Sequence, residues 1–403
     1  MATKSDLLAR WNTTIETGAR NAILEQLKSF DPPLFPADFT RQWERDTGAY
    51  PSQSPDADYQ DPLFLQKLLA KREFAESLQK KWTPDDEACG STDFFEVTPV
   101  QRFAANLMSP RSPYMSALLY HGVGVGKTCA AVQISEAWLH EYPKDKVFLI
   151  TPPTIQEGFY KTMFNIDKVK FGTGDKDPNT TVGCTGNTYM ELTGTLLERD
   201  PAKIQRRVDK AIRQRYRVSG YLQFANYVDK LIKPFRSLPD GDRIEQEKRA
   251  ISKEFSGKLL IVDEAHNLRD ILGSDLEEAP TKKSTTDIDA DEPIEAGGEE
   301  TKKDMANGKI MTPFLQKVLK YSRGLKLVLL TATPMYNTYK EIIFILNLLL
   351  MNDKKAELTE KDIFKSDGSF QVGGEELLGR IASRYVSFMR GENPNSFPIR
   401  LMP

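Results

Sequence analysis

The segment HGVGVGKT, residues 121–128, lies directly after an apolar run and directly before a helical pattern. Glycines allow backbone N–H groups to turn inward around phosphates, and the first turn of a helix favours negative charge. We therefore expect Lys127 to reach the β- and γ-phosphates of a nucleotide and the Thr128 hydroxyl to bind Mg²⁺. His121 stands where this pattern usually has its first glycine. The sequence predicts a nucleotide-binding loop that comprises Gly122, Gly124, Val125, Gly126, Lys127 and Thr128.

The segment LLIVDEAH, residues 259–266, places two carboxylates at the end of a second apolar run. Asp263 would hold Mg²⁺ through coordinated waters, and Glu264 would polarise the water that attacks the γ-phosphate. His266, one of three histidines in the chain, would couple this site to neighbouring motifs. Alone, such an acidic pair could also be a helix cap. Its position downstream of a phosphate-binding loop favours the catalytic interpretation.

A third apolar run ends in the segment TATP, residues 331–334. The hydroxyl groups of Thr331 and Thr333 can bond to a neighbouring acidic motif and report its state. In isolation this pattern indicates only a turn. As the third motif in this order, it predicts a coupling element of the same site.

Short runs rich in Val, Ile and Leu must position these motifs, and they alternate with helical patterns. The runs cover residues 116–120, 146–150, 258–262 and 325–330, and the helical patterns cover residues 129–140 and 339–351. This alternation predicts an α/β fold with a mainly parallel sheet covered by helices on both faces. Ligands of such sheets bind at the carboxyl ends of the strands, where all three motifs lie.

The sequence divides into three parts. Residues 1–90 are rich in Trp, Pro and charge and predict a mostly helical N-terminal extension. Residues 91–352 predict the nucleotide-binding domain, interrupted by an insertion at about 155–257 and by an acidic loop at about 274–305. The loop has almost no large apolar side chains, which predicts disorder. Residues 353–403 predict a linker.

The insertion holds a basic segment from Lys203 to Arg217, followed by aromatic residues at Tyr221, Phe224 and Tyr227. Two interpretations remain open. Cations with nearby aromatic rings suit a path for single-stranded nucleic acid, whereas a run of charges is commonly a solvated helix face.

Composition excludes several classes of protein. The chain has 403 residues and a net charge of −2, so any nucleic-acid contact must come from a local patch. The three cysteines form no C-x-x-C pair and support neither a disulfide framework nor a zinc site; Cys129 and Cys184 are expected to be buried small apolar residues in a reducing compartment. The N-terminus lacks a secretory signal, and the apolar run at 342–351 is too short for a bilayer, so no membrane association is expected.

In their order and context, the three motifs resemble those of the first RecA-like domain of superfamily-two, DEAH-box helicases and translocases. The resemblance implies ATP and Mg²⁺ as ligands. The segment from Thr98 to Gln101 resembles the one whose Gln reads the adenine, and Thr151-Pro152 resembles the motif whose backbone touches a nucleic-acid strand.

Softer motifs narrow the resemblance to helicases of nucleocytoplasmic large DNA viruses, a group that includes the poxvirus early transcription factor small subunit and nucleoside triphosphatase I. These motifs are Tyr50-Pro51, the segments at 71–74, 221–227 and 390–394, and Phe397-Pro398. The resemblance covers about residues 50–403. It implies a nucleic-acid-stimulated ATPase of viral transcription. DNA is favoured over RNA as the nucleic-acid partner. Implied partners are viral RNA polymerase or transcription-factor subunits, and implied locations are the virion and the virus factory in the host-cell cytoplasm.

Motors of this kind close a second RecA-like domain over the nucleotide, and that domain supplies arginines to the transferring phosphate. About 70 residues follow Thr333 without further alternation. The sequence therefore predicts only the first domain, with hydrolysis incomplete without the second. The alternative function is a non-catalytic nucleotide-binding subunit of a viral transcription or virion complex. The second and third motifs disfavour a P-loop kinase or GTPase.

Overall fold

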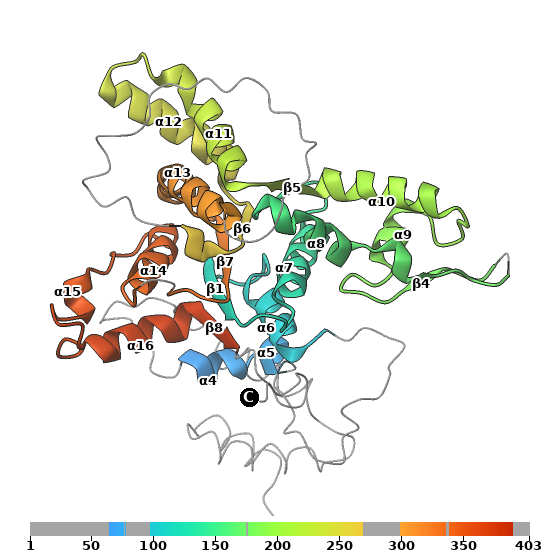
Figure 1. Ribbon diagram of the computed structural model, residues 1–403, viewed down its shortest axis with the longest axis horizontal. Helices are drawn as coiled ribbons and strands as arrows, with labels where there is room; N and C mark the ends of the chain where they lie inside the picture. The colour runs from blue at the N-terminus through green and yellow to red at the C-terminus, as the bar shows by residue number, and fades with distance from the viewer. Residues whose placement is uncertain are drawn as a thin grey trace, which may run out of the picture.

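The computed structural model (Figure 1) describes residues 64–75, 77, 97–174, 176–268, 299–335 and 338–389, with the side chains of 299–305 left out. Its centre is a six-stranded sheet in the order β5-β2-β6-β7-β1-β8, in which every neighbouring pair is parallel. The strands are β1 (Ser116–His121), β2 (Val147–Ile150), β5 (Tyr216–Ser219), β6 (Leu259–Val262), β7 (Lys326–Thr331) and β8 (Val386–Met389). A separate antiparallel pair joins β3 (Val169–Lys170) and β4 (Thr180–Thr181).

Helices cover both faces of the sheet because successive strand residues point to opposite sides. In β6, Leu259 and Ile261 belong to one apolar cluster, and Leu260 and Val262 belong to the other. The first cluster includes α6 (Pro99–Leu107), α7 (Lys127–Glu141), α8 (Pro153–Met163), α9 (Thr188–Thr193) and α10 (Pro201–Arg215). The second includes α11 (Tyr221–Ile232), α12 (Asp240–Phe255), α13 (Glu299–Tyr321), α14 (Glu341–Asn352) and α16 (Gly374–Tyr385).

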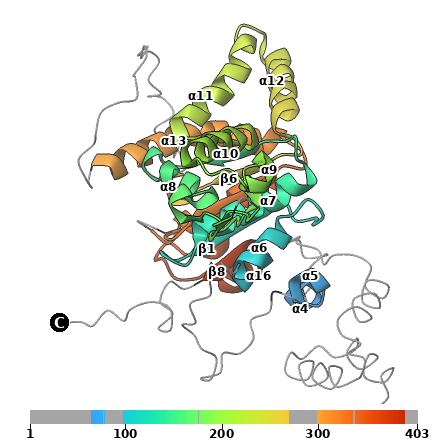
Figure 2. The ribbon, with the colours of Figure 1, turned by 90° about the vertical axis from the view of Figure 1, so that its right-hand side faces the viewer.

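The fold is a RecA-like α/β domain, which confirms the predicted fold class. Short elements complete it: η2 (Ile166–Lys168), η3 (Lys233–Phe235), η4 (Ala265–Asn267) and α15 (Glu360–Ile363). Two parts stand out from the body. Helices α11 and α12 project as a packed pair (Figure 2), and α9, α10 and β4 form an arm at the β5 edge of the sheet (Figure 1).

Two short helices precede α6 in the described part of the predicted N-terminal extension. They are α4 (Phe64–Leu69) and α5 (Arg72–Ala75), and Phe64, Leu68 and Phe74 are buried in the same apolar cluster as α6 and α7. These helices therefore pack onto the α/β domain itself. The rest of the predicted extension at 1–90 lies outside the described residues.

The predicted linker after residue 352 is wrong over residues 353–389. Helix α16 packs on the second face, and β8 adds a parallel strand beside β1, with Leu118 opposite Val386. The predicted insertion at 155–257 is also too broad, because β5 within it pairs with β2 along Val147–Ile150. Both unpredicted strands lie at sheet edges and are only partly buried, so their sequences lack the continuous apolar runs typical of central parallel strands.

The predicted acidic loop at about 274–305 ends too late, because α13 begins at Glu299. Residues 269–298 lie outside the described residues. Within the described residues, no helix is long and apolar enough to cross a membrane.

Candidate nucleotide-binding site

The loop between β1 and α7 turns at two glycines with positive φ. Gly124 has φ of 81° and Gly126 has φ of 84°, a region that side-chain-bearing residues reach only at a cost. A Cβ atom at position 126 would also lie 2.6 Å from Gln101 Nε2. Residue 126 must therefore be glycine for Lys127 and Thr128 to begin α7 in this position.

Gln101 fixes the loop from the neighbouring helix. It belongs to a capping box with Thr98 at the start of α6, and its side chain is buried. Its Nε2 donates a hydrogen bond to the Gly126 carbonyl oxygen at 3.2 Å. Gln101 thus lies against the predicted phosphate-binding loop, and its expected contact with adenine stays a prediction.

Lys127 brings the first two motifs together. Its Nζ lies 3.3 Å from Glu264 Oε1, and both side chains are largely buried. The two residues are 137 positions apart in the sequence, and the parallel sheet joins them because β1 and β6 end at the same edge. The structure therefore assembles the basic and acidic groups of one site.

Asp263, at the end of β6, is 3% exposed. Burial, and then the negative charge of Glu264, raise its pKa to about 6, while Lys127 opposes the shift. Its Oδ2 accepts a hydrogen bond from Thr151 Oγ1 at 3.5 Å. Its Oδ1 is buried and has no hydrogen-bond partner among the residues that the structure describes. Burying such an atom is costly unless a partner satisfies it.

A divalent cation fits this unsatisfied oxygen. Mg²⁺ is held by one or two carboxylates together with waters and substrate phosphates. Among the described residues, no group of three or more His, Cys, Asp or Glu side chains could hold a metal ion. Asp263 and Thr128 are the residues that would hold the ion.

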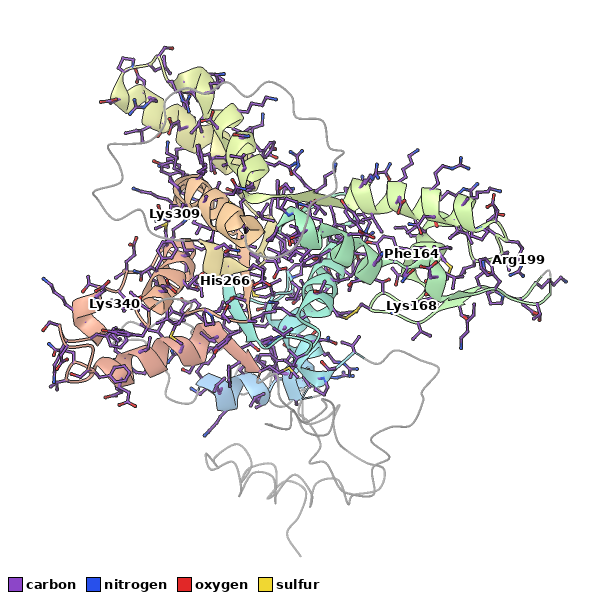
Figure 3. The ribbon with its side chains drawn as sticks, viewed as in Figure 1. Phe164, Lys168, Arg199, His266, Lys309 and Lys340 are labelled. Atoms are coloured by element: carbon purple, nitrogen blue, oxygen red, sulfur yellow. A yellow bond between two sulfur atoms is a disulfide. The ribbon has the colours of Figure 1, made fainter. Side chains whose placement is uncertain are left out.

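His266 connects the acidic motif to the third motif. Its Nδ1 lies 3.2 Å from Glu264 Oε2 and 3.0 Å from Thr331 Oγ1, and Thr331 Oγ1 also accepts the Thr333 backbone N–H at 3.0 Å. Burial raises the pKa of Glu264, but hydrogen bonding from His266 and the charge of Lys127 outweigh it, so the pKa lies below its usual value. Glu264 is therefore held ionised. Figure 3 shows His266 near the centre of the molecule.

Thr151 and Pro152 follow β2 and are both buried. The Thr151 hydroxyl points to Asp263, and its carbonyl oxygen accepts a hydrogen bond from Gln156 Nε2 at 3.2 Å. The side chain of Thr151 thus serves the acidic motif, and the expected backbone contact with a nucleic-acid strand stays a prediction.

Tyr221, the first residue of α11, holds the backbone of the acidic motif by hydrogen bonds. Its hydroxyl donates to the backbone oxygens of Asp263 and Glu264, at 2.7 and 3.1 Å, and accepts from Asn267 Nδ2 at 3.3 Å. Glu264 has φ of 47°, a strained value for a residue with a side chain. Gly308 of α13 leaves room for the Asn267 carbonyl, which a Cβ would overlap.

The sequence did not assign a role in the nucleotide site to Tyr221 or Gly308. Tyr221 stood out as one of several aromatic residues and as the first residue of the segment 221–227, and no spacing rule places it against a motif 42 positions away. A glycine inside a long helix was the one available signal for Gly308, since glycine weakens helices and often marks close packing.

His121 replaces the usual glycine at the end of β1. It is 1% exposed, and its Nε2 lies 3.0 Å from Ser387 Oγ of β8. Burial, and then the charge of Lys127, lower its pKa to about 4. The imidazole is therefore neutral near pH 7 and joins the loop to the edge strand.

Cys129 and Cys184 form a disulfide, so the expectation of separate buried thiols is wrong. The two residues are 55 positions apart, and the sequence gives no sign that the segment between β4 and α9 reaches the first turn of α7. The bond ties that segment to the residue next to Thr128.

Comparisons with known proteins identify relatives of the chain as a whole. No family model matches the chain. A "Putative ATP-dependent RNA helicase" of Acanthamoeba polyphaga mimivirus is 25% identical over 94% of the chain and 30% of its own length. A second one from that virus is 24% identical over 75% of the chain and 42% of its own length. A "Putative helicase" of Frog virus 3 is 23% identical over 73% of the chain and 24% of its own length.

The chain is homologous to putative helicases of large DNA viruses. It spans less than half the length of each of these relatives. Among solved structures, the Sulfolobus solfataricus SWI2/SNF2 ATPase core in complex with dsDNA matches 70% of the chain and 41% of its own chain, with a TM-score of 0.36 and 14% identity.

Proposed function

We propose that this domain binds ATP with Mg²⁺ and hydrolyses it, as the ATPase domain of a DEAH-type superfamily-two helicase. The main support is the contact of Lys127 Nζ with Glu264 Oε1 at 3.3 Å, beside the unsatisfied Oδ1 of Asp263. Three groups thus meet at one sheet edge. They are a basic group that can face phosphates, an ionised carboxylate, and a carboxylate with an oxygen free to bind a cation.

Each side chain has a distinct part in the proposed reaction. Lys127 neutralises the β- and γ-phosphates and leaves its ion pair with Glu264 when the nucleotide binds. Glu264 then orients the attacking water and accepts its proton. Mg²⁺, held by Thr128 and Asp263, would neutralise charge on the phosphates. His266 passes the state of Glu264 to Thr331.

Finer parts of the proposal rest on the sequence resemblance. They are stimulation by nucleic acid, a contribution from a second RecA-like domain, a role in viral transcription with polymerase or transcription-factor subunits, and location in the virion and the virus factory. We expect DNA to stimulate more than RNA, although the mimivirus relatives are named as RNA helicases. Stimulation must therefore be measured with both nucleic acids.

Glu264→Gln tests the catalytic role. The amide keeps the shape of the side chain but cannot accept the proton, so hydrolysis should fall by about 10² or more while nucleotide affinity is kept. We would measure single-turnover hydrolysis of labelled ATP with protein in excess, alone and with DNA or RNA, so that slow turnover is visible. Glu245→Gln, at an exposed glutamate of α12, is the matched control.

Equal hydrolysis by the wild type and Glu264→Gln would remove Glu264 from the mechanism. Tight nucleotide binding by the wild type without any hydrolysis, with either nucleic acid present, would replace the proposal by the non-catalytic alternative.

A further inference from the structure

Helix α10 presents a strongly basic surface. Its sequence, PAKIQRRVDKAIRQR, has six basic residues and one acidic residue. Ile204, Val208 and Ile212 are buried against the sheet face, so the polar side of the helix is turned to solvent. Arg206, Arg207, Lys210 and Arg213 are exposed, and we call these four residues the α10 stripe.

The α10 stripe differs from an ordinary solvated helix face. Helix α12, which is also highly exposed, carries five acidic and four basic residues and pairs them, as in Arg243–Asp240 and Arg249–Glu245. Among the residues that the structure describes, none of the four side chains of the stripe makes an ion pair. Interspersed charges are typical of surfaces that serve only solubility, whereas a field of one sign attracts a charged partner.

The stripe is held rigidly. At the end of α10, Arg215 binds Glu136 of α7 at 2.7 Å, and the hydroxyls of Tyr189 and Tyr216 donate to the other oxygen of the same carboxylate at 2.6 and 2.7 Å. At the start of the helix, Asp200 caps the backbone N–H groups of the first turn. A preorganised row of cations loses little freedom when a partner binds.

The geometry points to a phosphate backbone as the partner. Residues 206, 210 and 213 lie on one face of the helix and span about 10 Å. Three of the four cations are arginines, whose planar groups bind phosphate oxygens in pairs. The apolar side of α10 is buried, so this helix cannot insert into lipid as an interfacial helix does.

We propose that the α10 stripe is a nucleic-acid contact separate from the nucleotide site. Figure 1 shows α10 in the arm at the β5 edge of the sheet. Strand β5 is the sheet edge opposite β8. The contact extends the surface available to a bound strand beyond the predicted position near Thr151.

The test replaces the four stripe residues by Gln in one variant. Its control replaces four exposed cations of α11 and α12, Lys230, Lys248, Arg249 and Lys253, by Gln, which changes the net charge equally. Fluorescence anisotropy with labelled oligothymidylate would give affinity over a range of salt concentrations. The stripe variant should lose about tenfold or more in affinity, and its salt slope should fall by up to about 3, since each phosphate contact on a single strand contributes about 0.7.

The control variant should stay within about threefold of the wild type. Equal weakening of both variants, or no weakening of the stripe variant, would overturn the proposal, and so would competition by polyglutamate as strong as that by unlabelled oligothymidylate. If the fourfold variant does not fold, Arg206→Gln with Arg207→Gln gives the same comparison with a smaller effect. ATP affinity, measured on the same samples, should not change, so failure here is distinguishable from failure of the proposed ATPase function.

Discussion

His121 gives the domain a specific sensitivity to acid. In the folded state its pKa is about 4, against an ordinary value of 6.5, chiefly because the imidazole is buried. Between pH 6.5 and pH 4, His121 is therefore mostly protonated in the unfolded chain and mostly neutral in the folded chain. Stability from the neutral His121 is fully present above pH 6.5 and is lost as the pH falls toward 4.

The size of this effect follows from the two pKa values. The difference between the folded and ordinary pKa values of His121 corresponds to about 3 kcal/mol in full, of which about 2 kcal/mol should be lost between pH 7 and pH 5. Other titrating groups add their own pH dependence. The quantity to compare is therefore the unfolding free energy lost between pH 7 and pH 5, in the wild type and in His121→Asn. The asparagine cannot titrate but keeps a polar group near Ser387.

Urea unfolding at pH 7 and pH 5 measures both losses. Between pH 7 and pH 5, His121→Asn should lose about 2 kcal/mol less unfolding free energy than the wild type, whatever its stability at pH 7. His140→Asn, which alters a histidine with an 85% exposed side chain, should lose as much as the wild type. The reasoning is refuted if wild type and His121→Asn lose the same stability between the two pH values.

Two further substitutions probe how the site is held in place. Tyr221→Phe removes the hydroxyl that donates to the Asp263 carbonyl, while the Glu264 carbonyl keeps its hydrogen bond from the Asn267 N–H. The loss should cost about 1–3 kcal/mol of unfolding free energy and about tenfold in ATP hydrolysis, with nucleotide affinity kept. Tyr142→Phe, at a residue that is 46% exposed, is the control, and unchanged stability and turnover would argue against a supporting role for Tyr221. Gly126→Ala forces a methyl group into a positive-φ position and toward Gln101, which should cost at least about 1–2 kcal/mol and weaken nucleotide binding. Gly158→Ala, in an exposed turn of α8 with open space around it, should instead stabilise by about 0.5–1 kcal/mol, and a similar gain at position 126 would contradict the strain argument.

The central strands were predictable because parallel strands buried on both faces have continuous apolar runs. Val262 and Thr331 end two such runs, so the motifs that follow them could be placed at one sheet edge. The edge strands β5 and β8 could not be found this way. Strand β5 has an exposed arginine at 217, and β8 has a largely exposed phenylalanine at 388.

The functional motifs were visible in the sequence because their chemistry requires fixed local spacing. Their supports were not visible, because they depend on contacts between distant elements. Tyr221 reaches the acidic motif only through the position of α11, and Cys129 meets Cys184 only because the segment after β4 lies against α7. The replacement of the usual glycine by His121 was visible in the sequence. The contact that His121 makes was not, because its partner Ser387 lies in β8, a strand that was not predicted.

The central claim is that Lys127 and the acidic motif form one Mg²⁺-dependent nucleotide site. Isothermal titration of a non-hydrolysable ATP analogue, with and without Mg²⁺, tests it most directly in wild type, Lys127→Ala and the control Lys144→Ala, which alters an exposed lysine. We expect Mg²⁺-dependent binding by the wild type and the control, and no measurable binding by Lys127→Ala. Equal affinity of Lys127→Ala and wild type for the analogue would contradict the account.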